Sequence, residues 1–245
     1  PLQVTGFTTS PVPATPEGAR TIRDIENSAQ KDSPLSRLLW PHGAPQGKEE
    51  DEEVSRDVAF LRDPANKYFL VTEDASNTAV AYVWWQHAKG RTEAEWAETY
   101  ANRYRPEGMN KALMDATSGV RFLKRAKILG EQDVFSIFYL LNDPTHETLL
   151  GLTISVNFEE LYVRPEFQRR GLGGMLVEKG LREADELGLP AYTEATEEGL
   201  GLYLKHGFKE VDRVTVDLEL WGGAKGQVST YTLLLRHAKG YLMRD

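Results

Sequence analysis

Apolar residues recur at helical spacing in the first part of the chain. Ala19, Ile22 and Ile25 fall on one stripe, and they follow Thr15, a good N-cap, and Pro16, which favours the first helical position. The pattern therefore predicts a helix over "TPEGARTIRDIENSAQ". Two further helices are expected at "SPLSRLLW" and "KEEDEEVSRDVAFLRDP", the second with its carboxylates at the end that the helix dipole favours.

Alternating or β-branched segments predict strands around these helices. "LQVTGFTT" is expected to be a first strand, stopped by the prolines that follow. "KYFLVTED" and "TAVAYVWWQHA" are separated by a short turn and predict an antiparallel pair. From 90 to 132 the chain becomes charged and helix-favouring, which indicates a helical insertion.

The second half alternates strands and helices. "VFSIFYLL" and "LLGLTISV" are strand candidates, and "FEELYV" leads into a helix that ends at Gly188. Strand, helix and strand in succession after Phe158 predict a parallel pair with a crossover helix. The remaining elements are expected to be the strand "AYTEAT", the short helix "EEGLGLYLKH", and the strands "KEVDRVTVDLEL" and "STYTLLLRH".

Composition narrows the function classes. The chain has 245 residues and 40% hydrophobic residues, so we expect one domain over residues 1–245 with the insertion at about 90–132. A net charge of −8 disfavours a nucleic-acid partner, and no apolar run approaches the length that crosses a membrane. With no cysteine and five scattered histidines, we expect no metal site. With no pattern of a secretory signal and no membrane-spanning run, we expect a cytoplasmic protein.

The segment "RPEFQRRGLGGMLVEK" combines two arginines with three glycines at the predicted start of a helix. The free amide hydrogens of a helix N-terminus attract anions, and Gly171, Gly173 and Gly174 let a phosphate approach the backbone. Arg169 and Arg170 would add positive charge. The spacing matches neither the G-x-G-x-x-G fingerprint, which needs glycine at Leu176, nor a P-loop. A close-packed glycine turn with solvated arginines explains the same residues.

Three signals in order resemble the GCN5-related N-acetyltransferase (GNAT) superfamily. They are the strand end V-x-P, the loop Q-R-R-G-L-G and the later motif Y-x-x-x-G-F, all within residues 161–208. Shorter segments also resemble puromycin N-acetyltransferase-like and fungal members of the superfamily. The resemblance implies an α/β GNAT fold, with a mixed, mostly antiparallel sheet, a splayed parallel strand pair and flanking helices.

The resemblance also implies acetyl-CoA as co-substrate. In the family the loop amides hold the pyrophosphate of coenzyme A, and the edge of the fourth strand holds its pantetheine arm. The strand residues concerned would be Leu161 and Val163. Thr196 stands where the family often has an asparagine that contacts the cofactor, so the resemblance makes Thr196 a further candidate for cofactor binding. The loop residues concerned would be Gln168, Arg169, Arg170, Gly171, Leu172, Gly173 and Gly174.

Catalytic roles follow from the same resemblance. A base four or six positions before the valine of V-x-P falls on Glu159 or Asn157, and only Glu159 can accept a proton. Glu160 is expected to point to the opposite face. Tyr203 occupies the position of the family's proton-donating tyrosine. A salt-bridged strand carboxylate and a packing tyrosine are the structural alternatives.

The expected function is acetylation of a small-molecule amine by direct transfer in a ternary complex, by a monomer or homodimer. A protein or peptide N-acetyltransferase and a non-catalytic CoA-binding sensor are the alternatives. The insertion is expected to shape the acceptor site or to form an oligomer contact. "RFLKRAK", residues 121–127, is expected to be a charged helix face, with the 3′-phosphate of the cofactor as its alternative partner.

Overall fold

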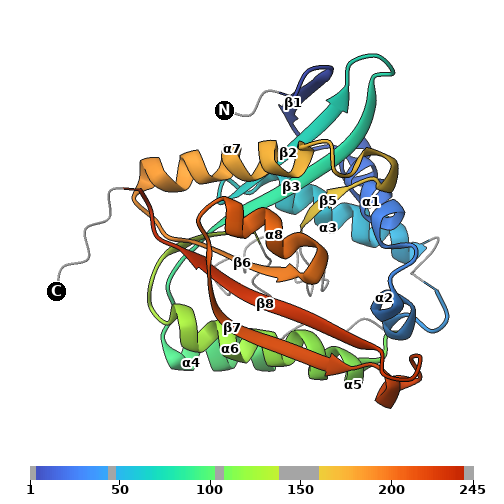
Figure 1. The fold of residues 1–245 in the computed structure, drawn as a ribbon, viewed down its shortest axis with the longest axis vertical. Helices are drawn as coiled ribbons and strands as arrows, with labels where there is room; N and C mark the ends of the chain where they lie inside the picture. The colour runs from blue at the N-terminus through green and yellow to red at the C-terminus, as the bar shows by residue number, and fades with distance from the viewer. Residues whose placement is uncertain (1–3, 44–47, 103–107, 138–159, 240–245) are drawn as a thin grey trace.

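The computed structural model describes residues 4–43, 48–102, 108–137 and 160–239. These residues form a sheet with the strand order β1-β2-β3-β4-β6-β8-β7, to which β5 adds by pairing with β3 (Figure 1). The strands are β1 (Phe7–Pro11), β2 (Asn66–Glu73), β3 (Thr78–Ala88), β4 (Val134–Ile137), β5 (Leu161–Val163), β6 (Ala191–Thr196), β7 (Lys209–Asp217) and β8 (Val228–Arg236).

The helices before β4 follow the sequence pattern closely. Helix α1 begins at Pro16, and the Thr15 side chain caps it by accepting a hydrogen bond from the Gly18 amide, as predicted. Helices also occupy the described part of the expected insertion, where a π-helical turn, Asp115–Gly119, joins two of them. The helices are α1 (Pro16–Gln30), α2 (Pro34–Leu39), α3 (Lys48–Arg62), α4 (Glu93–Ala101), α5 (Lys111–Met114) and α6 (Val120–Leu129).

Two helices follow β5. Helix α7 (Leu172–Leu187) ends at Gly188, which adopts a left-handed conformation, as the sequence predicted. Helix α8 (Glu197–Lys205) is capped by the side chain of Thr196. Within the described parts of the chain, no helix combines the length and the apolar character needed to cross a membrane.

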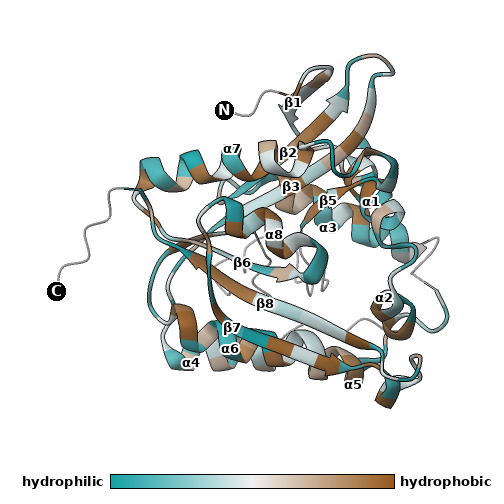
Figure 2. Ribbon diagram, in the orientation of Figure 1, coloured by the Kyte–Doolittle hydropathy of each residue, from teal (hydrophilic) through white to brown (hydrophobic). Residues whose placement is uncertain are grey.

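Helices cover both faces of the sheet, and each face has its own core. On one face α7 and α8 pack against a cluster that includes Trp85 and Phe135. On the other face the cluster that includes Tyr82 and Trp84 packs beneath α1, α2 and the insertion helices. Apolar colouring is concentrated on the strands and the inward sides of the helices (Figure 2). The two adjacent tryptophans thus serve opposite faces, because successive strand residues alternate.

The strand pairing corrects one expectation. The parallel partner of β6 is β4, through Phe135↔Ala191 and Ile137↔Thr193, and not β5. Strand β5 pairs antiparallel with β3, through Val83↔Leu161, while β4 pairs with the other end of β3, through Ala88↔Val134. Strands β4 and β5 therefore lie end to end along β3. The expected strand "LLGLTISV" lies outside the described residues.

Gly180 lets α7 approach the sheet closely. A Cβ atom at Gly180 would lie 1.9 Å from Cε2 of Trp85, whose ring is buried and stacks on Phe135 with centroids 5.2 Å apart.

We expect Gly180→Ala to destabilise the fold by about 1–3 kcal/mol, because the helix or the ring must move. Gly201→Ala on α8 is the matched control, since a Cβ atom at that position would have no heavy atom within 4 Å, and it should stabilise by about 0.5–1 kcal/mol. Urea denaturation measures both. Equal stability of the two variants would contradict this packing.

Candidate active site

The edge of β5 that faces away from β3 is open. The Trp84 amide donates to the Glu160 carbonyl at 2.8 Å, and the Arg164 amide donates to the Val80 carbonyl at 2.9 Å. In an antiparallel ladder alternate residues face the partner strand, so the backbone groups of Leu161 and Val163 point away from β3. No strand among the described residues pairs with that side of β5. The Val163 carbonyl instead accepts a hydrogen bond from Nε2 of Gln168, at 3.1 Å.

The start of α7 offers amide hydrogens beside this edge. The Met175 amide donates to the Gly171 carbonyl, so the amides of residues 172–174 precede the first intrahelical bond. Gly171 has φ +89° and Arg169 has φ +59°, and such turns can direct neighbouring amides to one side. Arg169 and Arg170 are exposed at the rim. This arrangement suits a pyrophosphate group, and it uses the loop residues that the sequence singled out.

Gly173 is the point where β5, α7 and α8 meet. A Cβ atom there would lie 3.1 Å from Cδ2 of Leu202 and 3.5 Å from Cδ2 of Leu161. Tyr203, next to Leu202, is buried and its ring contacts Phe208 edge-on, with centroids 5.6 Å apart. The three sequence signals therefore converge in space.

The remaining candidates have different outcomes. The Thr196 hydroxyl accepts a hydrogen bond from the Gly199 amide at 3.3 Å, so this side chain serves as a helix cap. Glu159 and Asn157 lie outside the described residues, and the choice between them stays a prediction. Glu160 is described, and it lies on the face of β3 and β5 that α1 covers, because it is opposite Trp84 in the ladder.

Sequence reasoning missed an acidic cluster on that face. It consists of Glu26 on α1, Glu53 and Asp57 on α3, and Glu160. Arg23 forms ion pairs with Glu53 and with Asp57, the latter at 3.0 Å. Burial raises the pKa of Asp57 to about 6 and that of Glu26 to about 8, and it raises the pKa of Glu160 well above its usual range, with Glu26 and Asp57 adding to the effect. The available signal was that Glu26 follows Ile22 by four positions, on the inner side of the helix.

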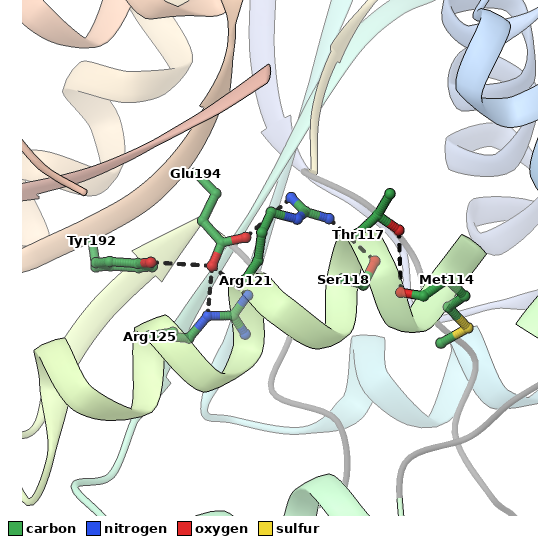
Figure 3. A network of polar contacts seen from close by, with 7 residues as sticks. All are labelled: Met114, Thr117, Ser118, Arg121, Arg125, Tyr192 and Glu194. Atoms are coloured by element: carbon green, nitrogen blue, oxygen red, sulfur yellow. Dashed lines mark hydrogen bonds and ion pairs between the residues drawn. The ribbon is translucent and has the colours of Figure 1, made fainter. Parts of the chain in front are cut away.

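A second polar cluster joins α6 to β6 on the same side of the sheet (Figure 3). The Glu194 carboxylate accepts a hydrogen bond from Nε of Arg125 at 2.8 Å and pairs with Nη1 of Arg121 at 3.0 Å, and the Tyr192 hydroxyl donates to it at 3.1 Å. Burial opposes ionisation of Glu194, but the two guanidinium groups outweigh it and lower its pKa. The guanidinium group of Arg121 also lies over the ring of Tyr231, 3.8 Å from its centroid.

This cluster corrects the expectation that residues 121–127 present one charged helix face, because two of the cations are buried. Arg121 and Arg125 are four positions apart, so both point to the sheet and are buried. A charged residue in the middle of the strand "AYTEAT" was the sequence signal for their partner. Among the described residues, no three or more His, Asp or Glu side chains are arranged so that they could hold a metal ion.

Comparison with known proteins finds a match to one family model in the second half of the chain. A family model described as the acetyltransferase (GNAT) domain matches residues 136–210. The matched segment therefore resembles the acetyltransferase domain of the GNAT superfamily. No curated protein sequence matches it. The narrower likeness to puromycin N-acetyltransferase-like and fungal members stays a prediction.

Solved structures share the GNAT fold. A mosquito arylalkylamine N-acetyltransferase-like protein is 10% identical with a TM-score of 0.60, and the match covers 94% of this chain and 99% of that one. A Drosophila melanogaster polyamine N-acetyltransferase, which forms N-acetylagmatine, is 14% identical with a TM-score of 0.56, covering 94% and 99%. A Salmonella typhimurium protein described as an acetyltransferase and solved with acetyl-CoA is 13% identical with a TM-score of 0.52, covering 98% and 99%. At these identities the likeness establishes the fold alone.

The Glu194 cluster should be important for stability. Replacing Glu194 with Gln leaves two buried guanidinium groups without their shared carboxylate, and we expect a loss of about 3–5 kcal/mol in the free energy of unfolding. Asp212→Asn is the control, because its ion pair with Lys124, at 2.7 Å, is partly exposed and should contribute at most about 1 kcal/mol. Denaturant titration measures both losses. A loss for Glu194→Gln no larger than the control would show that the cluster is not needed for stability.

The acidic cluster should make stability depend on pH. A carboxyl group whose pKa is raised by folding binds more protons in the folded state, so stability is full below its ordinary pKa of 4.5 and falls as pH rises through about 8. We expect Glu26→Gln to be more stable than the wild type at pH 8, by about 1–3 kcal/mol, and to differ less from it at pH 5. Glu17→Gln, at an exposed position of α1, should follow the wild type. Urea denaturation at both pH values measures the difference, and parallel curves for Glu26→Gln and the wild type would contradict the shift.

Proposed function

We propose that this protein is an acetyl-CoA-dependent N-acetyltransferase that acetylates the amine of a small molecule by direct transfer in a ternary complex. The observation that carries the proposal is the open edge of β5 beside the free amides at the start of α7. This pair of features offers hydrogen bonds to an extended amide-containing chain and to a pyrophosphate at its end. Coenzyme A combines these two groups, and the superfamily uses acetyl-CoA.

The loop and strand residues divide the binding of the co-substrate. The amides of residues 172–174, with Arg169 and Arg170, would hold the pyrophosphate, and Leu161 and Val163 would pair with the pantetheine arm. When bound, acetyl-CoA supplies the activated acetyl group. The Thr196 hydroxyl is already engaged as the cap of α8, so we assign it no contact with the cofactor through that oxygen.

Two side chains would move protons. An alkylamine with a pKa of about 10.4 is almost entirely protonated at neutral pH, so a base must take a proton before its nitrogen can attack. Glu159 stays the candidate for this role. The nitrogen then forms a bond to the acetyl carbon as the carbon–sulfur bond breaks, the Tyr203 hydroxyl gives its proton to the departing sulfur, and the surplus proton on the nitrogen passes to the Tyr203 oxygen and restores its hydroxyl. The small-amine acceptor is supported by the mosquito and Drosophila neighbours, whose names specify arylalkylamines and polyamines.

Thiol release from acetyl-CoA tests this function. We expect release with a pool of small amines and polyamines and little release with a pool of basic peptides. Tyr203→Phe should lower kcat at least about tenfold while the Kd for acetyl-CoA stays unchanged, because only proton donation is removed. Arg169→Glu should weaken acetyl-CoA binding about tenfold by placing a negative charge beside the pyrophosphate.

Arg182→Glu is the matched control, since it makes the same charge change at an exposed position farther along α7. It should leave the Kd for acetyl-CoA and kcat near their wild-type values. Release with the peptides alone would make the protein a peptide N-acetyltransferase. Binding of acetyl-CoA without release in either pool would indicate a CoA-binding sensor.

A further inference from the structure

Two carboxyl groups, one of them buried and the other partly buried, lie between α1 and the sheet. Glu160 is 4% exposed, and Glu26 lies near enough to raise its pKa. No described residue donates a hydrogen bond or forms an ion pair with either carboxyl group. Tyr82 is 1% exposed and lies opposite Tyr162 of β5, with ring centroids 5.7 Å apart, and burial, Glu26 and Glu160 together raise the pKa of its hydroxyl. Glu26 and Glu160 are called the carboxyl pair below.

Such a pair is unusual because buried polar groups are almost always hydrogen-bonded. Arg23 lies nearby but does not form an ion pair with the carboxyl pair, since its guanidinium group is bound by Glu53 and Asp57. The raised pKa values are the consequence of placing like charges together away from water. A positively charged ligand with several N–H donors would satisfy the pair.

The carboxyl pair lies next to the strand that would hold the cofactor. Glu160 immediately precedes β5, and Gln30 on α1 donates a hydrogen bond to the Tyr162 hydroxyl on that strand. Arg164, directly after β5, forms an ion pair with Asp24 on α1, at 2.5 Å. These two contacts fix α1, and with it Glu26, against β5. A cation between Glu26 and Glu160 therefore sits beside the open strand.

We propose that the carboxyl pair and the Tyr82 hydroxyl bind the ammonium group of the acceptor and select cationic amines that carry no carboxylate beside the nitrogen. This proposal rests on the proposed function and names its substrate class. An ammonium group offers three donors, which match two carboxyl groups and a hydroxyl. The carboxylate of an amino acid would instead meet Glu26, Glu160 and Asp57, while Arg23 is already engaged, so repulsion would exclude it.

Two pairs of compounds differ only in that carboxylate, tyramine with tyrosine and agmatine with arginine. We expect the wild-type protein, with coenzyme A present, to bind at least one of the two amines, and to bind the matching amino acid at least about tenfold more weakly, as measured by calorimetry. Glu160→Gln and Glu26→Gln should each weaken binding of the preferred amine at least about tenfold and bring the two compounds of its pair closer in affinity. Glu17→Gln, on the same helix, should bind as the wild type does.

Folding of the variants is checked by thermal unfolding at pH 8, where removal of either carboxyl charge should leave the midpoint unchanged or raise it. Calorimetry measures binding of the amine without any turnover. One of the two proposals can therefore be contradicted while the other stands. Selective amine binding that depends on the carboxyl pair, without thiol release, would overturn the proposed function and keep this inference. This inference would be overturned by any of three results. The wild type could bind the amine and the amino acid equally, or bind neither amine. Alternatively, thiol release could occur while both variants keep the full preference of the wild type for the amine over the amino acid.

Discussion

Backbone hydrogen bonding is left open on one side of β5, because β6 pairs with β4 and not with β5. Strand β3 can hold both segments only end to end, and the last residues of β6 then run on beside β8 with no other described strand paired to them. Unpaired strand edges normally invite association with another chain. Here the edge lies beside the start of α7, where Gly173 allows close contact with Leu161. The open edge of β5 is therefore next to a helix of the same chain.

The two polar clusters on the α1 and α6 side of the sheet differ in how they are satisfied. Around Glu194, two arginines and a tyrosine hydroxyl supply donors, and the carboxylate is held ionised. The described residues supply no such donors to the carboxyl pair, and its pKa values rise. The first arrangement is typical of a fixed structural tie between a helix and a strand. The second leaves carboxyl oxygens without hydrogen-bond donors among the described residues, which is typical of a binding site.

Local signals in the sequence predicted most of the fold. Thr15 with Pro16, Gly188, and the spacing of apolar residues are short-range features, so the helices and their ends could be inferred directly. The end-to-end placement of β4 and β5 along β3 could not be inferred. The alternation of apolar and polar residues shows which side chains share a face of a strand, but not which strands are its neighbours. The candidate cofactor loop could be singled out because its chemistry is local. The pairing of Glu26 with Glu160 and of Arg121 and Arg125 with Glu194 depends on contacts between distant segments, and the alternation of one strand could not reveal them.

Helix α1 connects the two halves of the proposed site. One side of it touches the residues around β5, through Asp24 with Arg164 and Gln30 with Tyr162, and the other side holds the ion pairs of Arg23 with α3. Glu26 lies between these attachments, so its position depends on both. Because Arg164 begins the loop that leads to the α7 amides, the same short segment orients the proposed pyrophosphate site and the carboxyl pair. A shift of α1 would therefore act on both sites, through Glu26 on the carboxyl pair and through Asp24 and Arg164 on the loop before α7, which couples recognition of the acceptor to recognition of the cofactor.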